Sequence, residues 1–159
     1  MLYLPALKRT KRISSSNRTG KFVSSEFSYE DLTTDEPKDY FFVWIEDTLC
    51  PTDEALTCHV IEAKPKNKKS GYSKRLVFID NEHFRCQKIS FFNRRGDLEK
   101  ELFFLGYQQY LDKFWRADIL DMVNVQTGKS TSLQWSNYKF QQGLKLSDFE
   151  PEKLKNASR

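Results

Sequence analysis

The sequence contains three cysteines, and the spacing of two of them is compatible with a cross-link. Cys50 and Cys58 flank the polar segment PTDEALT, whose proline is typical of a hairpin loop. Cysteines on facing strands at the base of a hairpin can lie within disulfide range. A disulfide between Cys50 and Cys58 and a pair of reduced, buried thiols are therefore equal alternatives. Cys86 is then the odd thiol.

The two histidines do not complete a metal site or a nucleophilic pair with these thiols. The sequence has no CxxC motif, and His59 and His83 stand apart, so we expect no zinc site. His59 directly follows Cys58, and adjacent residues of a strand point to opposite faces. A Cys–His catalytic pair is therefore disfavoured.

A group of carboxylates near residue 30 has the side-chain type that acid–base catalysis uses. No spacing within it identifies a reaction, and SYEDL at 28–32 is typical of a short helix whose first turn favours acids. We expect four acids to cap this helix and to lie in solvent: Glu26, Glu30, Asp31 and Asp35. The sequence thus predicts no catalytic residue, no cofactor and no enzyme activity.

The tetrapeptide TGKS at 127–130 resembles the end of a phosphate-binding P-loop. The full motif requires a glycine five residues before Gly128, so that backbone N–H groups can wrap the phosphate. Val123 occupies that position, inside a strand pattern. We therefore expect TGK to form a hairpin turn and not a phosphate site.

The elements that position these side chains are strands, because alternation of apolar and polar residues dominates from residue 40 onward. Short turns with Gly, Asn or Asp separate the runs, which predicts an antiparallel meander. A further short helix is expected at 147–156, where Ser147 or Asp148 can cap it. The predicted strands span residues 39–47, 56–64, 72–80, 84–92, 98–107, 114–126 and 130–140.

The composition suits one domain of 159 residues with a net charge of +4. Its basic stretches, 8–12, 64–69 and 72–75, are candidates for nucleic acid or anionic headgroups, but acids are spread along the whole chain. Dedicated nucleic-acid domains carry a denser basic stripe, so we expect no nucleic-acid partner. No run approaches the ~18 apolar residues of a membrane span.

Aromatic residues form 14% of the chain, and several are adjacent pairs, such as Phe41–Phe42, Phe91–Phe92 and Phe103–Phe104. Adjacent strand residues place a ring on each face. A curved sheet with material on both sides would bury both rings, so an apolar ligand cavity is one expectation. A dense core without a cavity is the equal alternative.

Six segments in order resemble outer-membrane lipoprotein-sorting-like proteins of the LolA/LolB-like superfamily. They are LYLPALKRTKRISSS (2–16), SSEFSYEDL (24–32), YSKRLVFID (72–80), NRRGDLEKEL (93–102), FWRADILDMVNVQTGKSTSLQW (114–135) and LSDFEPEKL (146–154). The resemblance implies a mainly β fold: a curved antiparallel sheet, or half-open β-barrel, with short helices on the concave side. It also implies a periplasmic, non-catalytic protein whose apolar cavity binds acyl chains of lipids or lipoproteins.

The resemblance implies cavity residues as well. SSEFSYEDL would lie near a lid over the cavity, and strand aromatics would line it. The candidate cavity residues are Phe27, Tyr29, Leu32, Phe42, Trp44, Phe78, Phe91 and Phe104.

Members of this family begin well upstream of the LYLP motif. We therefore expect residues 1–159 to form one LolA-like domain that lacks the family's N-terminal part. Such a domain can leave a sheet edge unpaired, which favours a homodimer. The alternative function is an envelope adaptor that docks an export system or another partner protein without transferring lipid.

Overall fold

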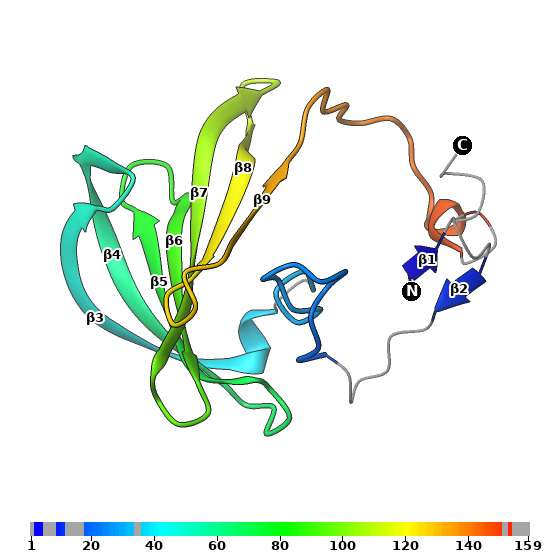
Figure 1. Cartoon of the computed structure of the whole chain (residues 1–159). Coiled ribbons are helices and arrows are strands. Elements are labelled where there is room, and N and C mark those ends of the chain that lie inside the picture. Colours follow the sequence, from blue (N-terminus) through cyan, green and yellow to red (C-terminus); the bar gives the residue numbers. More distant parts are fainter. Residues whose placement is uncertain (1, 5–8, 12–17, 34–35, 151–152, 154–159) are drawn as a thin grey trace.

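The fold is an open antiparallel sheet, shown in Figure 1 by a computed structural model that describes residues 2–4, 9–11, 18–33, 36–150 and 153. Each strand of the sheet pairs with the next one along the chain, which confirms the predicted meander. In order, the strands are β3 (Tyr40–Cys50), β4 (Asp53–Pro65), β5 (Tyr72–Asp80), β6 (Cys86–Asn93), β7 (Leu98–Tyr110), β8 (Phe114–Asn124) and β9 (Ser130–Gln134).

Near the N-terminus, β1 (Leu2–Leu4) and β2 (Arg9–Lys11) form a separate antiparallel hairpin. One 3-10 turn, η3 (Pro37–Asp39), leads into β3. The helix predicted at 28–32 is absent: Ser28 forms a β-bridge with Lys21, and residues 29–32 form consecutive turns. Of the helix predicted at 147–156, residues 147–149 belong to the 3-10 turn η4 (Leu146–Phe149), and residues 151–152 and 154–156 lie outside the described residues. No helix in the described ranges is long and apolar enough to cross a membrane.

The last strand is shorter than predicted. β9 ends at Gln134, its last partner on β8 is Ile119, and Asn137 adopts a left-handed φ of 58° that interrupts extended backbone. The TGK segment forms the turn between β8 and β9, as predicted. The backbone N–H of Asn124 donates to the carbonyl of Lys129 at 2.8 Å, and Gly128 has a φ of 71°, a conformation that glycine adopts without strain.

The register defines two faces of the sheet. Ile61, Val77, Ile89, Leu102 and Met122 are successive cross-strand neighbours, so their side chains share one face, which we call the inner face. The neighbouring row has the opposite orientation and belongs to the outer face. That row consists of Val60, Phe78, Lys88, Phe103 and Asp121.

Residues 18–33, which we call the plug, lie on the concave side of the curved sheet (Figure 1). The plug folds back on itself: the backbone N–H of Phe22 donates to the carbonyl of Phe27 at 2.7 Å. Phe27 is 1% exposed and packs in the core against the inner face. Its buried neighbours are Tyr72, Phe91, Leu102 and Met122. Turns, and not helices, therefore cover this end of the concave side.

At the opposite end of the strands, the first hairpin carries a disulfide. Cys50 and Cys58 are bonded across β3 and β4, with Cα atoms 4.9 Å apart, and both are buried. The nearby β5–β6 turn is organised by the carboxylate of Asp80, which is fully buried. Asp80 accepts the backbone N–H of His83 at 2.7 Å, Arg85 Nε at 2.9 Å and Gln87 Nε2 at 2.8 Å.

Acid is expected to destabilise this turn through Asp80. Burial raises the pKa of this carboxyl, but the hydrogen bonds from His83, Arg85 and Gln87 outweigh burial and hold the pKa below its ordinary 3.8. A lowered folded-state pKa stabilises the protein above the unfolded-state value, and that stabilisation is lost as the pH falls through the folded-state value.

We expect Asp80→Asn to be less stable than the unmodified chain at pH 7, with a difference that shrinks below about pH 4. Urea denaturation between neutral and strongly acidic pH measures the free energies of unfolding. Asp112→Asn, in the exposed β7–β8 turn, is the matched control. A difference independent of pH would contradict the proposed role of the Asp80 carboxylate.

Candidate functional site on the inner face

Beyond the plug, the inner face continues as an apolar surface. Phe104, Leu120 and Leu133 are cross-strand neighbours on β7, β8 and β9, and all three are half-buried. They pack against the edge of the core that Phe27 completes. Ile61 and Val77 extend the same surface toward β3 and are also half-buried. A continuous band of partly exposed apolar side chains thus crosses the sheet.

One end of this band deepens into an open hollow of about 290 Å³. Phe104 and Leu120 form its apolar wall. The remaining lining is largely aromatic, with one cation: Tyr107, Trp115, Arg116, Ala117, Trp135 and Tyr138. An apolar concavity with few polar groups has the character of a site for an apolar ligand.

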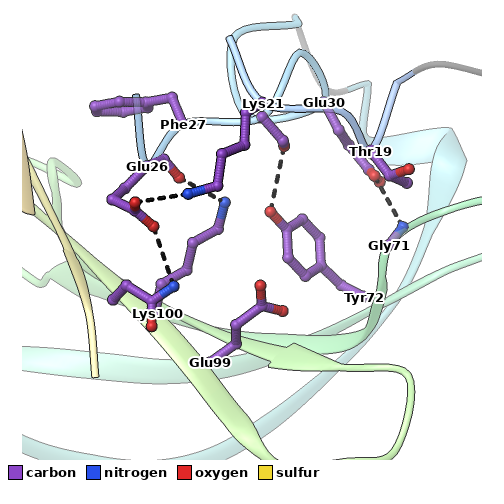
Figure 2. Close-up of a pocket in the computed structure, with 11 residues that line it drawn as sticks. Thr19, Lys21, Glu26, Phe27, Glu30, Gly71, Tyr72, Glu99 and Lys100 are labelled. Carbon is purple, nitrogen blue, oxygen red and sulfur yellow. Dashed lines mark hydrogen bonds and ion pairs between the residues drawn. The ribbon is translucent and has the colours of Figure 1, made fainter. Parts of the chain in front are cut away.

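The other end of the inner face is closed by buried charges between the plug and the sheet. Lys100 Nζ lies 2.6 Å from Asp31 Oδ2, and the two side chains are 5% and 0% exposed. Lys100 also donates to the carbonyl of Glu26 at 3.1 Å, as Figure 2 shows. The hydroxyl of Tyr72 donates to Asp31 Oδ1 at 2.7 Å. These contacts fix the middle of the plug to β5 and β7.

Two further carboxylates complete the attachment. Glu26 accepts Lys21 Nζ at 2.7 Å and Asn124 Nδ2 at 3.1 Å, and these hydrogen bonds lower its pKa. Glu30 accepts the backbone N–H of Gly71 at 3.0 Å and the hydroxyl of Ser70. The prediction that these acids lie in solvent is therefore wrong for Glu26, Glu30 and the side chain of Asp31. Asp35 lies outside the described residues.

A polar pocket of about 230 Å³ lies beneath the plug, beside Lys100 and Tyr72 (Figure 2). Burial and the neighbouring Asp31 raise the pKa of the Tyr72 hydroxyl, which keeps it protonated. Because Lys100 is already paired with Asp31, the pocket offers a structural ion pair and not a poised acid–base couple.

The other reactive side chains are separated from one another. Cys58 is in the disulfide, while Nδ1 of His59 lies 2.6 Å from Oδ1 of Asp47. Burial raises the pKa of the Cys86 thiol to about 12, so it is not a thiolate at neutral pH. Among the residues that the structure describes, no three His, Cys, Asp or Glu side chains gather as metal ligands.

The predicted cavity residues divide into several groups. Phe27 and Phe91, both 1% exposed, are in the core beneath the plug, and Phe104 lines the hollow. Phe42 and Trp44 belong to the inner face of β3 but are 50% and 62% exposed. The structure therefore brings Phe27 and Phe91 together and leaves the two β3 residues at the sheet edge.

The remaining three predicted residues lie away from the inner apolar surface. Phe78 is on the outer face, with Lys88 Nζ 5.3 Å from its ring centroid. Tyr29 is half-buried and meets Phe22 edge to face, with ring centroids 5.8 Å apart. Leu32 is 41% exposed.

Residues of the apolar band were missed at the sequence level, among them Ile61, Val77, Leu120 and Leu133. Alternation placed most of them in strands, but it does not tell which face of each strand turns inward. The face depends on register, and register shifts interrupt several strand pairs, for example between Phe78 and Ile79.

Known proteins share both the sequence pattern and the fold. A family model described as "-like: Uncharacterized protein" matches residues 1–156. A crystal structure of a domain described as an outer membrane lipoprotein-sorting protein, from Vibrio parahaemolyticus, is 48% identical. It superimposes with a TM-score of 0.90 over 96% of this chain and 64% of its own.

Two further solved structures resemble the chain. A DUF1329 family protein from Desulfovibrio piger is 26% identical, with a TM-score of 0.86 over 96% of this chain and 62% of its own. A LolA superfamily protein from Nitrosomonas europaea is 18% identical and shares the fold, with a TM-score of 0.71 over 95% of this chain and 66% of its own. The chain spans less than two thirds of each solved structure. No curated protein sequence matches it.

Proposed function

We propose that the inner face binds acyl chains of lipids or lipoproteins, because the chain belongs to the family whose model matches residues 1–156, is 48% identical to a domain described as an outer membrane lipoprotein-sorting protein, and shares the fold of a LolA superfamily protein. The observation that carries the proposal is the apolar band with its hollow beside Phe104 and Leu120. The proposed activity is binding, without catalysis and without a cofactor.

The physical basis is the removal of acyl methylene groups from water. Each buried CH₂ contributes about 0.8 kcal/mol, so a chain lying along part of the band gains several kcal/mol. The plug closes one end with satisfied charges, which leaves the hollow as the accessible region. Arg116 at the hollow is suited to pair with an anionic headgroup.

We propose the periplasm as the compartment, because the relative from Vibrio parahaemolyticus is described as an outer membrane lipoprotein-sorting protein domain. The disulfide between Cys50 and Cys58 supports an oxidising compartment.

Displacement of a fluorescent fatty acid by palmitate tests acyl-chain binding. We expect Leu120→Asp to weaken palmitate binding by about tenfold or more, because the substitution places a charge against the buried acyl chain. Ile119→Asp, on the adjacent residue of β8, is the matched control, since Ile119 is also half-buried but faces outward.

Equal losses in these two variants would indicate damage to the sheet and not to a site. Saturable binding that neither variant changes would place the ligand elsewhere. The absence of measurable binding by the unmodified chain would refute the proposal.

The edge strand β3 favours a second candidate, a protein–protein adaptor. Phe41, Val43 and Trp44 are 64%, 53% and 62% exposed, and β3 has a strand neighbour only on its β4 side within the described sheet. Exposed apolar edges invite pairing with another strand, from a partner protein or from a second copy. Absence of acyl binding, together with a concentration-dependent dimer that Val43→Lys abolishes, would favour this candidate.

A further inference from the structure

Positive charge gathers at one end of the sheet. Successive hairpins of a meander alternate between the two ends, so the β4–β5, β6–β7 and β8–β9 turns share an end, which is the lower end in Figure 1. These turns span residues 66–71, 94–97 and 125–129. They carry six exposed cations and a single acid, Asp97. The cations, which we call the basic end, are Lys66, Lys68, Lys69, Arg94, Arg95 and Lys129.

Little of this charge is neutralised locally. Arg95 Nε lies 3.5 Å from Asp97 in an exposed pair. Arg94 Nε donates to the carbonyl of Ser70 at 2.9 Å, which ties two of the turns together. The adjacent turn η3 adds one lysine and one acid, Asp39. The preceding Glu36 pairs with that lysine, Lys38, so this end keeps a net positive charge.

The structure separates the basic end from other cations of the same sequence region. Lys74 pairs with Glu62 at 2.9 Å, and Arg75 is 4% exposed, with its guanidinium 5.3 Å from the ring centroid of Tyr72. The two cations of the basic stretch 72–75 therefore have partners within the sheet, whereas the lysines of the β4–β5 turn are exposed to solvent. At the opposite end, Asp53, Glu54, Glu82 and Asp112 are exposed acids.

We propose that the basic end docks on an anionic phospholipid surface, through contacts with lipid phosphates. The proposal rests on the proposed acyl-chain function and adds the surface by which the protein attaches to a membrane. Cations on three adjacent turns suit a plane of headgroups, and each cation near an anionic bilayer contributes about 1 kcal/mol. The three turns contain no aromatic residue on which a nucleic-acid base could stack.

Co-sedimentation with vesicles tests this docking. The unmodified chain is offered vesicles of phosphatidylcholine alone, or of phosphatidylcholine and phosphatidylglycerol in a three-to-one ratio. We expect binding only to the anionic vesicles, and we expect that binding to be lost at about 0.5 M salt, where surface charges are screened.

A variant with four substitutions in the basic end tests whether this surface contacts the vesicles. Lys68→Gln, Lys69→Gln, Arg95→Gln and Lys129→Gln together are expected to weaken vesicle binding by about tenfold or more. The matched control removes the same charge from other exposed positions: Lys113→Gln, Lys139→Gln, Lys145→Gln and Lys153→Gln. The control is expected to bind within about twofold of the unmodified chain.

Several results would overturn the docking proposal: equal loss in the two four-residue variants, equal binding to neutral vesicles, no vesicle binding, or duplex DNA binding in place of vesicle binding. Palmitate affinity is measured in the same variants. Because the basic end lies away from the hollow, its removal is expected to leave palmitate binding intact. Docking and acyl binding can therefore fail independently.

Discussion

Lys100→Ala is expected to lower the free energy of unfolding by about 3–5 kcal/mol, because it leaves a buried carboxylate without its cation. Lys100 and Asp31 are 2.6 Å apart, and the side chain of Asp31 is fully buried. Native domains are stable by only about 5–15 kcal/mol, so the variant would lose a large part of its stability. Urea denaturation followed by fluorescence or circular dichroism measures the change.

Lys113→Ala is the matched control, since Lys113 is exposed in the β7–β8 turn, and it is expected to change stability by less than about 0.5 kcal/mol. Lys100→Met combined with Asp31→Asn removes both charges and is expected to recover part of the loss. A double variant as unstable as the sum of its single variants would contradict the coupling between Lys100 and Asp31.

Phe27→Ala is also expected to lower the free energy of unfolding by about 3–5 kcal/mol. Phe27 is 1% exposed and is the fully buried apolar residue of the plug in the core, where the half-buried Phe22 also packs. Truncation leaves a cavity against Phe91, Leu102 and Met122, since strand backbones cannot collapse far into it.

Hydrogen exchange distinguishes local from global loss in Phe27→Ala. We expect faster exchange at the backbone N–H of Phe22 and of Glu30, which bond within the plug, than in β7. Phe149→Ala is the control, because Phe149 is 72% exposed in η4. A change below about 1 kcal/mol in Phe27→Ala would show that the buried charges alone hold the plug.

The order and type of the main elements could be predicted from the sequence because strand signals are local. The runs at 72–80 and 98–107 are rich in aliphatic and aromatic residues and are bounded by polar turn segments, and they match β5 and the first part of β7. Gly128 likewise predicted the β8–β9 turn, because the preference of glycine for turns is also a local signal. A hairpin around PTDEALT likewise allowed Cys50 to lie near Cys58, the pair that the structure bonds. The predicted loop was too long, because only residues 51–52 form the turn and residues 53–57 belong to β4.

The site was less predictable, because it depends on partners that are far apart in the chain. Nothing in SSEFSYEDL indicates that Asp31 meets Lys100, 69 residues away. Because no cation lies near Asp31 in the sequence, its side chain was predicted to lie in solvent. Phe78 was assigned to the cavity because aromatic content alone does not reveal its face, and the bulges of the sheet reset that face locally.

The attachment of the plug also determines its alignment with the sheet. The two carboxylate oxygens of Asp31 accept hydrogen bonds from three donors: the backbone N–H of Ser28, the hydroxyl of Tyr72 and the ammonium group of Lys100. A slip of the plug by a single residue would present Leu32 or Glu30 to Lys100 in place of Asp31. Leu32 has no carboxylate, and Glu30 would have to leave Ser70 and Gly71. Apolar packing tolerates small displacements, whereas buried charges tolerate almost none. The buried charges therefore allow only one alignment of the plug with the sheet.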